Sequence, residues 1–174
     1  RNINEGVRFG KLIYTYSEDD GKTWQGPNGR YSFYDLESPV YEIVGHNWGW
    51  HLMAPPRLMS NGMVYLPMNA STDPLRLADI RCEPVFARSS NILTETDPAK
   101  IVFDYRPAPP HGLFVPLKGK PGQAHGMEAQ IVELSDHRLF SVMRTGNGSV
   151  YYTVSSDFGE TWAPAKPLRR DDGG

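Results

Sequence analysis

Short alternating runs of apolar and polar residues predict β-strands along most of the chain. The clearest are Leu12–Tyr16 and Val150–Val154, which are rich in β-branched and aromatic residues. A period of two residues is typical of a strand with one buried face. No stretch carries a convincing period of 3.6 residues, and the 17 glycines and 15 prolines suit short strands joined by turns. The pattern therefore predicts an all-β fold.

Both runs lead into the same eight-residue pattern, S-x-D-x-G-x-T-W, at residues 17–24 and 155–162. The aspartates can accept hydrogen bonds from backbone N–H groups of their own turns, and the glycines fit where φ is positive. The tryptophans can bury apolar area between neighbouring sheets. We interpret the pattern as structural rather than catalytic. Its residues are Ser17, Asp19, Gly21, Thr23, Trp24, Ser155, Asp157, Gly159, Thr161 and Trp162.

A repeating unit of four strands emerges around this pattern. A degenerate third copy begins at residues 85–90, and hairpins with turns at residues 60–62 and 135–137 precede the two later copies. Each unit then reads strand, tight turn, strand, loop, strand, box, strand, which is the order of a propeller blade. The predicted units are an outer half-blade at residues 11–33 and blades at residues 51–105 and 127–168.

About two and a half blades are fewer than the roughly four to eight of a closed propeller. An open set of blades would leave long sheet edges unpaired. We therefore expect residues 1–174 to form a partial propeller domain. Either the remaining blades of the same protein or a second copy of the chain would close it.

The eight-residue pattern resembles the Asp box, or BNR repeat, of the sialidase (neuraminidase) family. The resemblance implies four-stranded antiparallel blades of a six-bladed propeller. It also implies a secreted glycoside hydrolase that cleaves terminal sialic acid from glycans with a tyrosine nucleophile, an exception to the usual pair of carboxylates. A glycan substrate, the absence of a cofactor, and an extracellular or periplasmic location follow from the same resemblance.

One carboxylate and one guanidinium are expected to meet at the loop-rich end of the last blade. Glu128 lies eight residues before the turn at Asp136, and Arg144 lies eight residues after it, so an antiparallel hairpin makes them near neighbours. The preceding blade has Met53 and Asn69 at the equivalent positions. The pair is therefore not required by every blade. From the residues alone, a structural ion pair and a functional site both remain open.

The resemblance assigns roles to this pair. Residues 127–134 and the arginine sixteen residues after Glu128 look like the sialidase segment that carries two active-site residues. Glu128 would then activate the catalytic tyrosine, and Arg144 would be one of three arginines that bind the substrate carboxylate. The tyrosine and the other two arginines are expected outside this chain, which alone would be inactive. Glu5 lies near the position expected for the acid/base residue.

Three further residues are candidates for sugar binding on loops that enter the blades. They are Trp48, Trp50 and His125. Aromatic and imidazole side chains suit sugars through stacking and hydrogen bonds, although one of the tryptophans would alternatively pack between blades. The histidines have no metal-ligand spacing, so no metal site is predicted.

Composition narrows the class of function. A net charge of −2 argues against nucleic-acid binding by phosphate neutralisation. No apolar run approaches the roughly 18 residues of a membrane span. The single cysteine, Cys82, excludes an internal disulfide. Two other functions stay open: a propeller glycosidase that uses two carboxylates, with Glu128 as acid or nucleophile, and a non-catalytic Asp-box propeller that binds glycan or protein.

Overall fold

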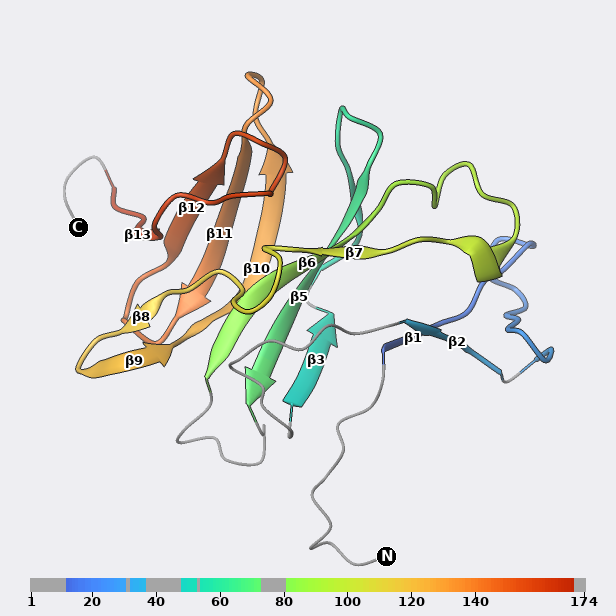
Figure 1. Cartoon of the computed structure of the whole chain (residues 1–174), viewed down its shortest axis with the longest axis horizontal. Helices are drawn as coiled ribbons and strands as arrows, with labels where there is room; N and C mark the ends of the chain where they lie inside the picture. Colours follow the sequence, from blue (N-terminus) through green and yellow to red (C-terminus); the bar gives the residue numbers. More distant parts are fainter. Residues whose placement is uncertain (1–11, 31, 37–47, 53, 73–80, 171–174) are drawn as a thin grey trace, which may run out of the picture.

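The computed structural model describes residues 12–30, 32–36, 48–52, 54–72 and 81–170. Apart from loops and one three-residue 3₁₀ turn, all regular elements in these ranges are β-strands. The strands pair antiparallel into four sheets that follow one another along the chain, and none of them closes on itself (Figure 1). The prediction of an all-β fold is therefore confirmed.

The first sheet has two strands, β1 (Leu12–Tyr14) and β2 (Tyr34–Leu36), which flank the first Asp box. Tyr14 stacks on Tyr34 with a ring-centroid distance of 5.0 Å. The Tyr14 hydroxyl donates a hydrogen bond of 2.6 Å to the carbonyl of Pro98, in the 3₁₀ turn Pro98–Lys100. This contact attaches the first sheet to the second one.

The second sheet has the strand order β3-β5-β6-β7, and β4 pairs with the first half of β5. The predicted hairpin around Asn61 is present, since Leu58 lies opposite Val64. The strands are β3 (Trp48–Leu52), β4 (Arg57–Leu58), β5 (Val64–Thr72), β6 (Cys82–Ser89) and β7 (Asp104–Arg106).

Trp48 and Trp50 do not lie on a loop, which corrects the sequence prediction. Both belong to β3, where Trp48 pairs with Thr72 and Trp50 pairs with Ala70. The strand after the hairpin turn, β5, runs on to Thr72, and its last residues offer an edge with which Trp48–Leu52 can pair. Aromatic residues are favoured in β-strands, so the Trp-Gly-Trp sequence forms a strand where the edge of β5 is available for pairing.

The third sheet has the strand order β10-β11-β12-β13. Its first two strands form the predicted hairpin around Asp136, with Glu133 opposite Leu139. The fourth, smaller sheet pairs β8 (Pro116–Leu117) with β9 (Lys120–Ala124) and was not predicted, because its Lys-Gly turn lacks the Asn-Gly or Asp-Gly signature. The strands of the third sheet are β10 (Gly126–Glu133), β11 (Leu139–Thr145), β12 (Tyr151–Ser155) and β13 (Lys166–Pro167).

The two Asp boxes form the same hydrogen-bonded turn. The Asp19 carboxylate accepts hydrogen bonds from the backbone N–H and the hydroxyl of Thr23, at 2.8 and 2.7 Å. Asp157 accepts the equivalent pair from Thr161 at 2.9 and 2.5 Å. The box glycines have φ of +82° and +83°, a conformation that costs glycine little. Each box therefore satisfies its own polar groups within the turn.

The tryptophans of the two boxes differ in environment. Trp162 is partly buried and stacks on Phe86 of the second sheet with a centroid distance of 5.4 Å. Trp24 is 53% exposed, and the shallow pocket beside it is lined by its own turn and the segment up to Phe33. The predicted burial between sheets is therefore wrong for Trp24, because no strand from another sheet lines that pocket among the described residues.

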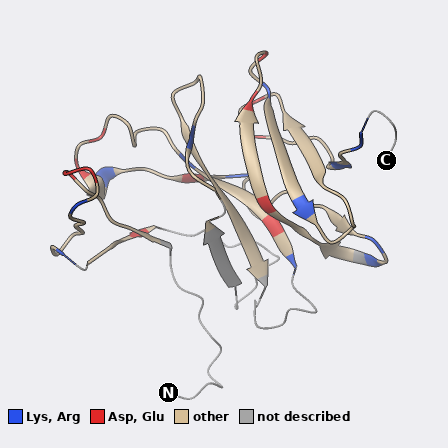
Figure 2. Cartoon of the chain, turned by 180° about the vertical axis from the view of Figure 1, so that it is seen from behind, with Lys and Arg blue, Asp and Glu red and all other residues tan. Residues whose placement is uncertain are grey.

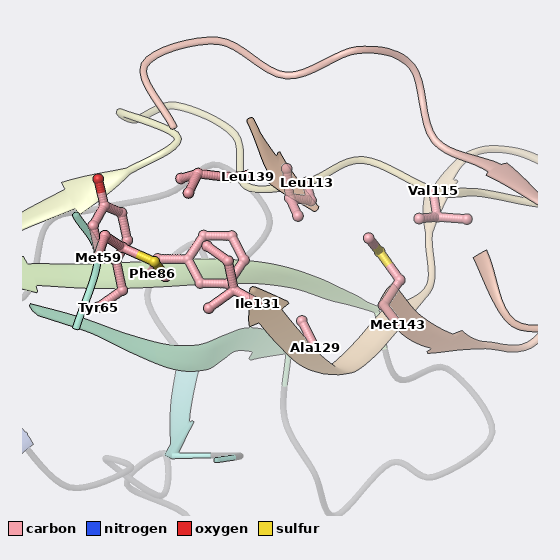
Figure 3. Close-up of a cluster of buried hydrophobic side chains, with 9 residues drawn as sticks. All are labelled: Met59, Tyr65, Phe86, Leu113, Val115, Ala129, Ile131, Leu139 and Met143. Atoms are coloured by element: carbon pink, nitrogen blue, oxygen red, sulfur yellow. The ribbon is translucent and has the colours of Figure 1, made fainter. Parts of the chain in front are cut away.

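The main apolar core lies between the second and third sheets (Figure 3). Burying a large apolar side chain contributes about 1.5–3 kcal/mol, so this cluster holds the two sheets face to face. Its buried members are Met59, Tyr65, Phe86, Leu113, Val115, Ala129, Ile131, Leu139 and Met143.

An ionic network centred on Arg88 crosses the same contact. The Arg88 side chain is only 7% exposed and donates hydrogen bonds of 2.8 and 2.6 Å to the two carboxylate oxygens of Asp104. It also lies 2.9 Å from Glu160, in the second Asp box, which receives a further bond of 2.8 Å from Arg106. The hydrogen bonds from Arg88 to Asp104 raise the pKa of Arg88. The network therefore joins β6 and β7 to the box of the third unit.

At the turn end of the same contact, Glu133 connects the two hairpins. Its carboxylate accepts hydrogen bonds from the Ser60 hydroxyl and from the Ser60 backbone N–H, the latter at 2.6 Å. His137 Nδ1 lies 2.8 Å from the same carboxylate. These bonds, led by that of the Ser60 hydroxyl, lower the pKa of Glu133 from its usual 4.5 to about 2.

Glu133 should consequently make stability depend on acid pH. A carboxylate whose pKa is lower in the folded state than in the unfolded state stabilises the folded protein at every pH above the unfolded-state pKa. This contribution is lost as the pH falls through the folded-state pKa. We expect Glu133→Gln to lower the urea midpoint at pH 7 and to converge with the unmodified protein as the pH falls from 4.5 toward 2. Glu18→Gln, an exposed glutamate on the first box, is the control; a gap that persists unchanged at pH 2 would contradict the assignment.

Candidate functional site

The start of β10 and the end of β11 form one end of the third sheet, which we call the β10–β11 rim. Met127 pairs with Arg144 there, and regular pairing resumes with Gln130 opposite Val142. One extra residue is therefore inserted in β10, which is a β-bulge. Counting from Asp136 had placed Glu128 directly opposite Arg144, and the bulge moves it by one position.

Glu128 has an unusual backbone conformation in this bulge. Its φ is +55°, a left-handed conformation that costs a residue other than glycine about 1–3 kcal/mol. The buried side chain of Asn69, from β5 of the second sheet, stabilises it. In the amide orientation that satisfies both ends, the Asn69 oxygen accepts a bond of 3.2 Å from the Glu128 N–H, and its nitrogen donates one of 3.3 Å to the Met68 carbonyl.

Glu128 contacts Arg144 at the bulge. Arg144 Nη1 donates a hydrogen bond of 2.8 Å to Glu128 Oε1, and the two side chains are 64% and 51% exposed. An exposed ion pair contributes about 0–1 kcal/mol to stability. That is no more than the backbone strain at Glu128 costs, so the ion pair's own contribution to stability does not explain the arrangement. The pair is accordingly the best candidate for a functional site.

The chemistry of the pair suits an anionic ligand. A guanidinium carries five N–H donors in a planar fork, and the hydrogen bond to Glu128 uses one nitrogen. The remaining donors of Arg144 can bind a carboxylate in two-point fashion. Glu128 holds the guanidinium in place and keeps a second carboxylate oxygen available as an acceptor or base.

His125 lies one residue before β10, beside the start of β6 through a bridge with Cys82. Its Nδ1 is buried and has no hydrogen-bond partner in the structure. The ring lies against Gly146, where an added Cβ would be 3.2 Å from Nδ1. Among the described residues, no hydrogen bond or ion pair joins His125 to Glu128 or Arg144, so the structure does not bring this candidate into the pair.

None of the other sequence candidates has a described side chain. Glu5 lies outside the described residues, and Trp48 and Trp50 are placed only by their backbone in β3. The Asp box of the third unit follows β12 and therefore lies at the end of the sheet opposite the rim. Charged residues lie mostly at strand ends and in turns, while most of the strand length is uncharged (Figure 2).

Three buried groups near the rim were missed by sequence reasoning: Asn69, Glu83 and Cys82. The alignment of the two hairpins placed Asn69 at the position equivalent to Arg144, and this equivalence could have indicated that Asn69 lies near the rim. Glu83 accepts a hydrogen bond of 2.7 Å from the backbone N–H of Gly112. Burial raises the pKa of the Cys82 thiol to about 12, so it is protonated at neutral pH and is a poor nucleophile.

Two general classes of site are absent from the described ranges. No group of three or more His, Cys, Asp or Glu side chains there is arranged to hold a metal ion. No helix in those ranges is long and apolar enough to cross a membrane.

Comparison with known proteins finds a similar fold but no family to which the chain can be assigned. No family model and no curated protein matches the chain. A solved structure of a protein of unknown function from Dyadobacter fermentans DSM 18053 is similar, with a TM-score of 0.53 and 16% sequence identity. The match covers 94% of this chain and 46% of that protein, so the chain spans less than half of the length of its structural neighbour. The likeness concerns the β-fold alone.

Proposed function

We propose that this chain belongs to a glycoside hydrolase resembling exo-sialidases, in which the β10–β11 rim binds the carboxylate of a terminal sialic acid. The observation that carries the proposal is the exposed Arg144–Glu128 pair, held by a strained bulge whose cost the pair's own stability does not offset. In the same proposal, the second and third sheets are blades of a sialidase-type propeller. The repeated box and the face-to-face packing of the two sheets support this.

In this proposal the two side chains have separate roles. Arg144 binds the substrate carboxylate through its free donors, and this orients the sugar. Glu128 keeps the guanidinium in position and accepts the proton of a nucleophile supplied by another part of the protein. The net reaction is hydrolysis: the glycosidic C–O bond breaks, the anomeric carbon of the sugar gains the hydroxyl of water, and the released glycan oxygen gains its proton.

The test is a comparison of substrates with the full-length protein. We expect release of the fluorophore from an α-linked fluorogenic sialoside and no release from neutral glycosides of the same fluorophore. Cleavage of neutral glycosides instead would favour a two-carboxylate glycosidase and contradict the proposal. Binding of sialosides without turnover, measured by calorimetry, would favour a non-catalytic glycan-binding protein and would also contradict it.

A further inference from the structure

A surface groove with a volume of about 330 Å³ lies beside the contact between the second and third sheets. We call it the junction groove. One wall is the segment after β7, from Pro107 to Phe114, and the other is the end of the second Asp box with the segment after it, from Glu160 to Ala165. All of its lining residues are described. Its volume lies at the lower end of the roughly 300–1,000 Å³ that is typical of small-ligand sites.

Hydrogen bonds fix the first wall against the start of β6. The Gly112 N–H donates a bond of 2.7 Å to the buried carboxylate of Glu83, and the Leu113 N–H donates one of 2.8 Å to the Pro84 carbonyl. A Cβ added at Gly112 would lie 2.6 Å from that carbonyl oxygen, so a larger residue would push the wall away from the strand. Glycine therefore allows this wall to lie close to β6.

The second wall is fixed in a similar way. The Ala163 N–H donates a hydrogen bond of 2.9 Å to the Val154 carbonyl. The Trp162 ring stacks on Phe86, and its indole N–H donates a bond of 3.1 Å to the Gly159 carbonyl. Both walls are thus in place before a ligand binds. A preformed groove loses little conformational entropy on binding.

Apolar rings make up much of the groove surface. The Phe114 ring is 43% exposed, and Pro107, Pro164 and Ala165 add further apolar surface. The half-exposed imidazole of His111 adds a polar ring on the same wall as Phe114. A flat aromatic surface of this kind suits a ligand that presents a face of C–H groups.

The oxygen atoms of the groove act as hydrogen-bond acceptors. The Thr161 hydroxyl already donates its proton to Asp157 at 2.5 Å, so toward a ligand it can only accept. The Glu160 carboxylate has about four lone-pair sites, and bonds from Arg88 and Arg106 occupy two of them. A ligand of this groove must therefore supply hydrogen-bond donors.

The charges around the groove favour a neutral ligand. None of its described lining residues is Lys or Arg. The guanidiniums of Arg88 and Arg106 contact the carboxylates of Asp104 and Glu160, so the two positive charges balance the two negative ones. A cation would gain little from a carboxylate that is already paired, and an anion would meet that carboxylate without a cation among the lining residues.

We propose that the junction groove binds a neutral sugar residue of a glycan. The C–H face of a pyranose ring suits Phe114 and the prolines, and the hydroxyl groups around its edge supply the donors that Glu160 and Thr161 require. The groove shares no lining residue with the β10–β11 rim, whose guanidinium suits an acidic ligand. The inference does not rest on the proposed hydrolase activity.

A ligand-observed NMR titration of the full-length protein with lactose, a neutral disaccharide, tests this proposal. We expect saturable binding that Phe114→Ala weakens by about tenfold, because the exposed aromatic surface is lost. His111→Ala should weaken binding as well, and it replaces Phe114→Ala if that variant does not fold. Phe33→Ala removes a phenyl ring of similar exposure, 49%, from the first unit, so this matched control should bind lactose like the unmodified protein.

Arg144→Ala separates the groove from the rim and should leave lactose binding unchanged. A loss of lactose binding in Arg144→Ala would overturn the proposal, since the sugar would then bind at the rim. Absence of saturable lactose binding, or equal losses for Phe114→Ala and Phe33→Ala, would overturn it too. The methyl glycoside of sialic acid is the anionic probe. If it bound as tightly as lactose and depended equally on Phe114, the groove would not select a neutral sugar.

Discussion

Replacing Arg144 by alanine is expected to lower kcat/KM for a sialoside by about 10²- to 10³-fold in the full-length protein. Loss of one oriented electrostatic contact typically costs about 2.7–4 kcal/mol of transition-state stabilisation. The exposed ion pair with Glu128 adds little to folding, so the urea midpoint should hardly change. Steady-state kinetics and urea unfolding on the same preparations would separate the two effects.

The hairpin offers a matched control for this experiment. Arg138 and Asp136 form an ion pair of the same length, 2.8 Å, with similar exposure, at the opposite end of β10 and β11. Arg138→Ala should therefore leave kcat/KM close to that of the unmodified protein. Equal losses for Arg144→Ala and Arg138→Ala would contradict the site assignment, because position on the rim would then not matter.

Replacing Arg88 by alanine is expected to lower the free energy of unfolding by about 3 kcal/mol. Removing one partner of a buried ionic network typically costs about 3–5 kcal/mol. The lower end applies here because Asp104 and Glu160 are partly exposed, so water can solvate them once Arg88 is gone. The variant also loses the packing of a nearly buried side chain between the second and third sheets.

Urea unfolding followed by tryptophan fluorescence would measure this effect, since Trp162 lies in the same contact. Arg138→Ala, at an exposed pair, should change stability by less than about 1 kcal/mol. A loss for Arg88→Ala as small as that of Arg138→Ala would mean that the network does not hold the two sheets together.

Local sequence signals predicted the local parts of the fold. The S-x-D-x-G-x-T-W turns and the hairpin at Asn61-Gly62 depend on residues a few positions apart, and the structure contains them. The strand character of Trp48–Leu52 was missed because it depends on the length of β5, a partner that is distant in sequence. The exposure of Trp24 was missed for a similar reason, since burial of a tryptophan requires a neighbouring sheet and no local pattern reports one.

In the candidate site too, the local features were predicted from sequence and the features that depend on distant residues were missed. Hairpin register predicted that Glu128 and Arg144 lie close together, and in the structure they form an ion pair. Register could not show the bulge at Glu128, because counting outward from the turn assumes one residue opposite one residue along the whole ladder. Nor could it show that Asn69 stabilises that bulge, since this contact joins two different sheets. The catalytic role of the pair stays a prediction.

The hydrogen bond from Glu128 to Asn69 has a consequence for ligand binding. Because the backbone of Glu128 is fixed by a residue of the preceding sheet, the rim takes its shape only when the two sheets are docked. A ligand that binds this shape binds the assembled state alone. By thermodynamic linkage, a saturating carboxylate ligand should then slow the separation of the two sheets and protect the amides along their contact from hydrogen exchange.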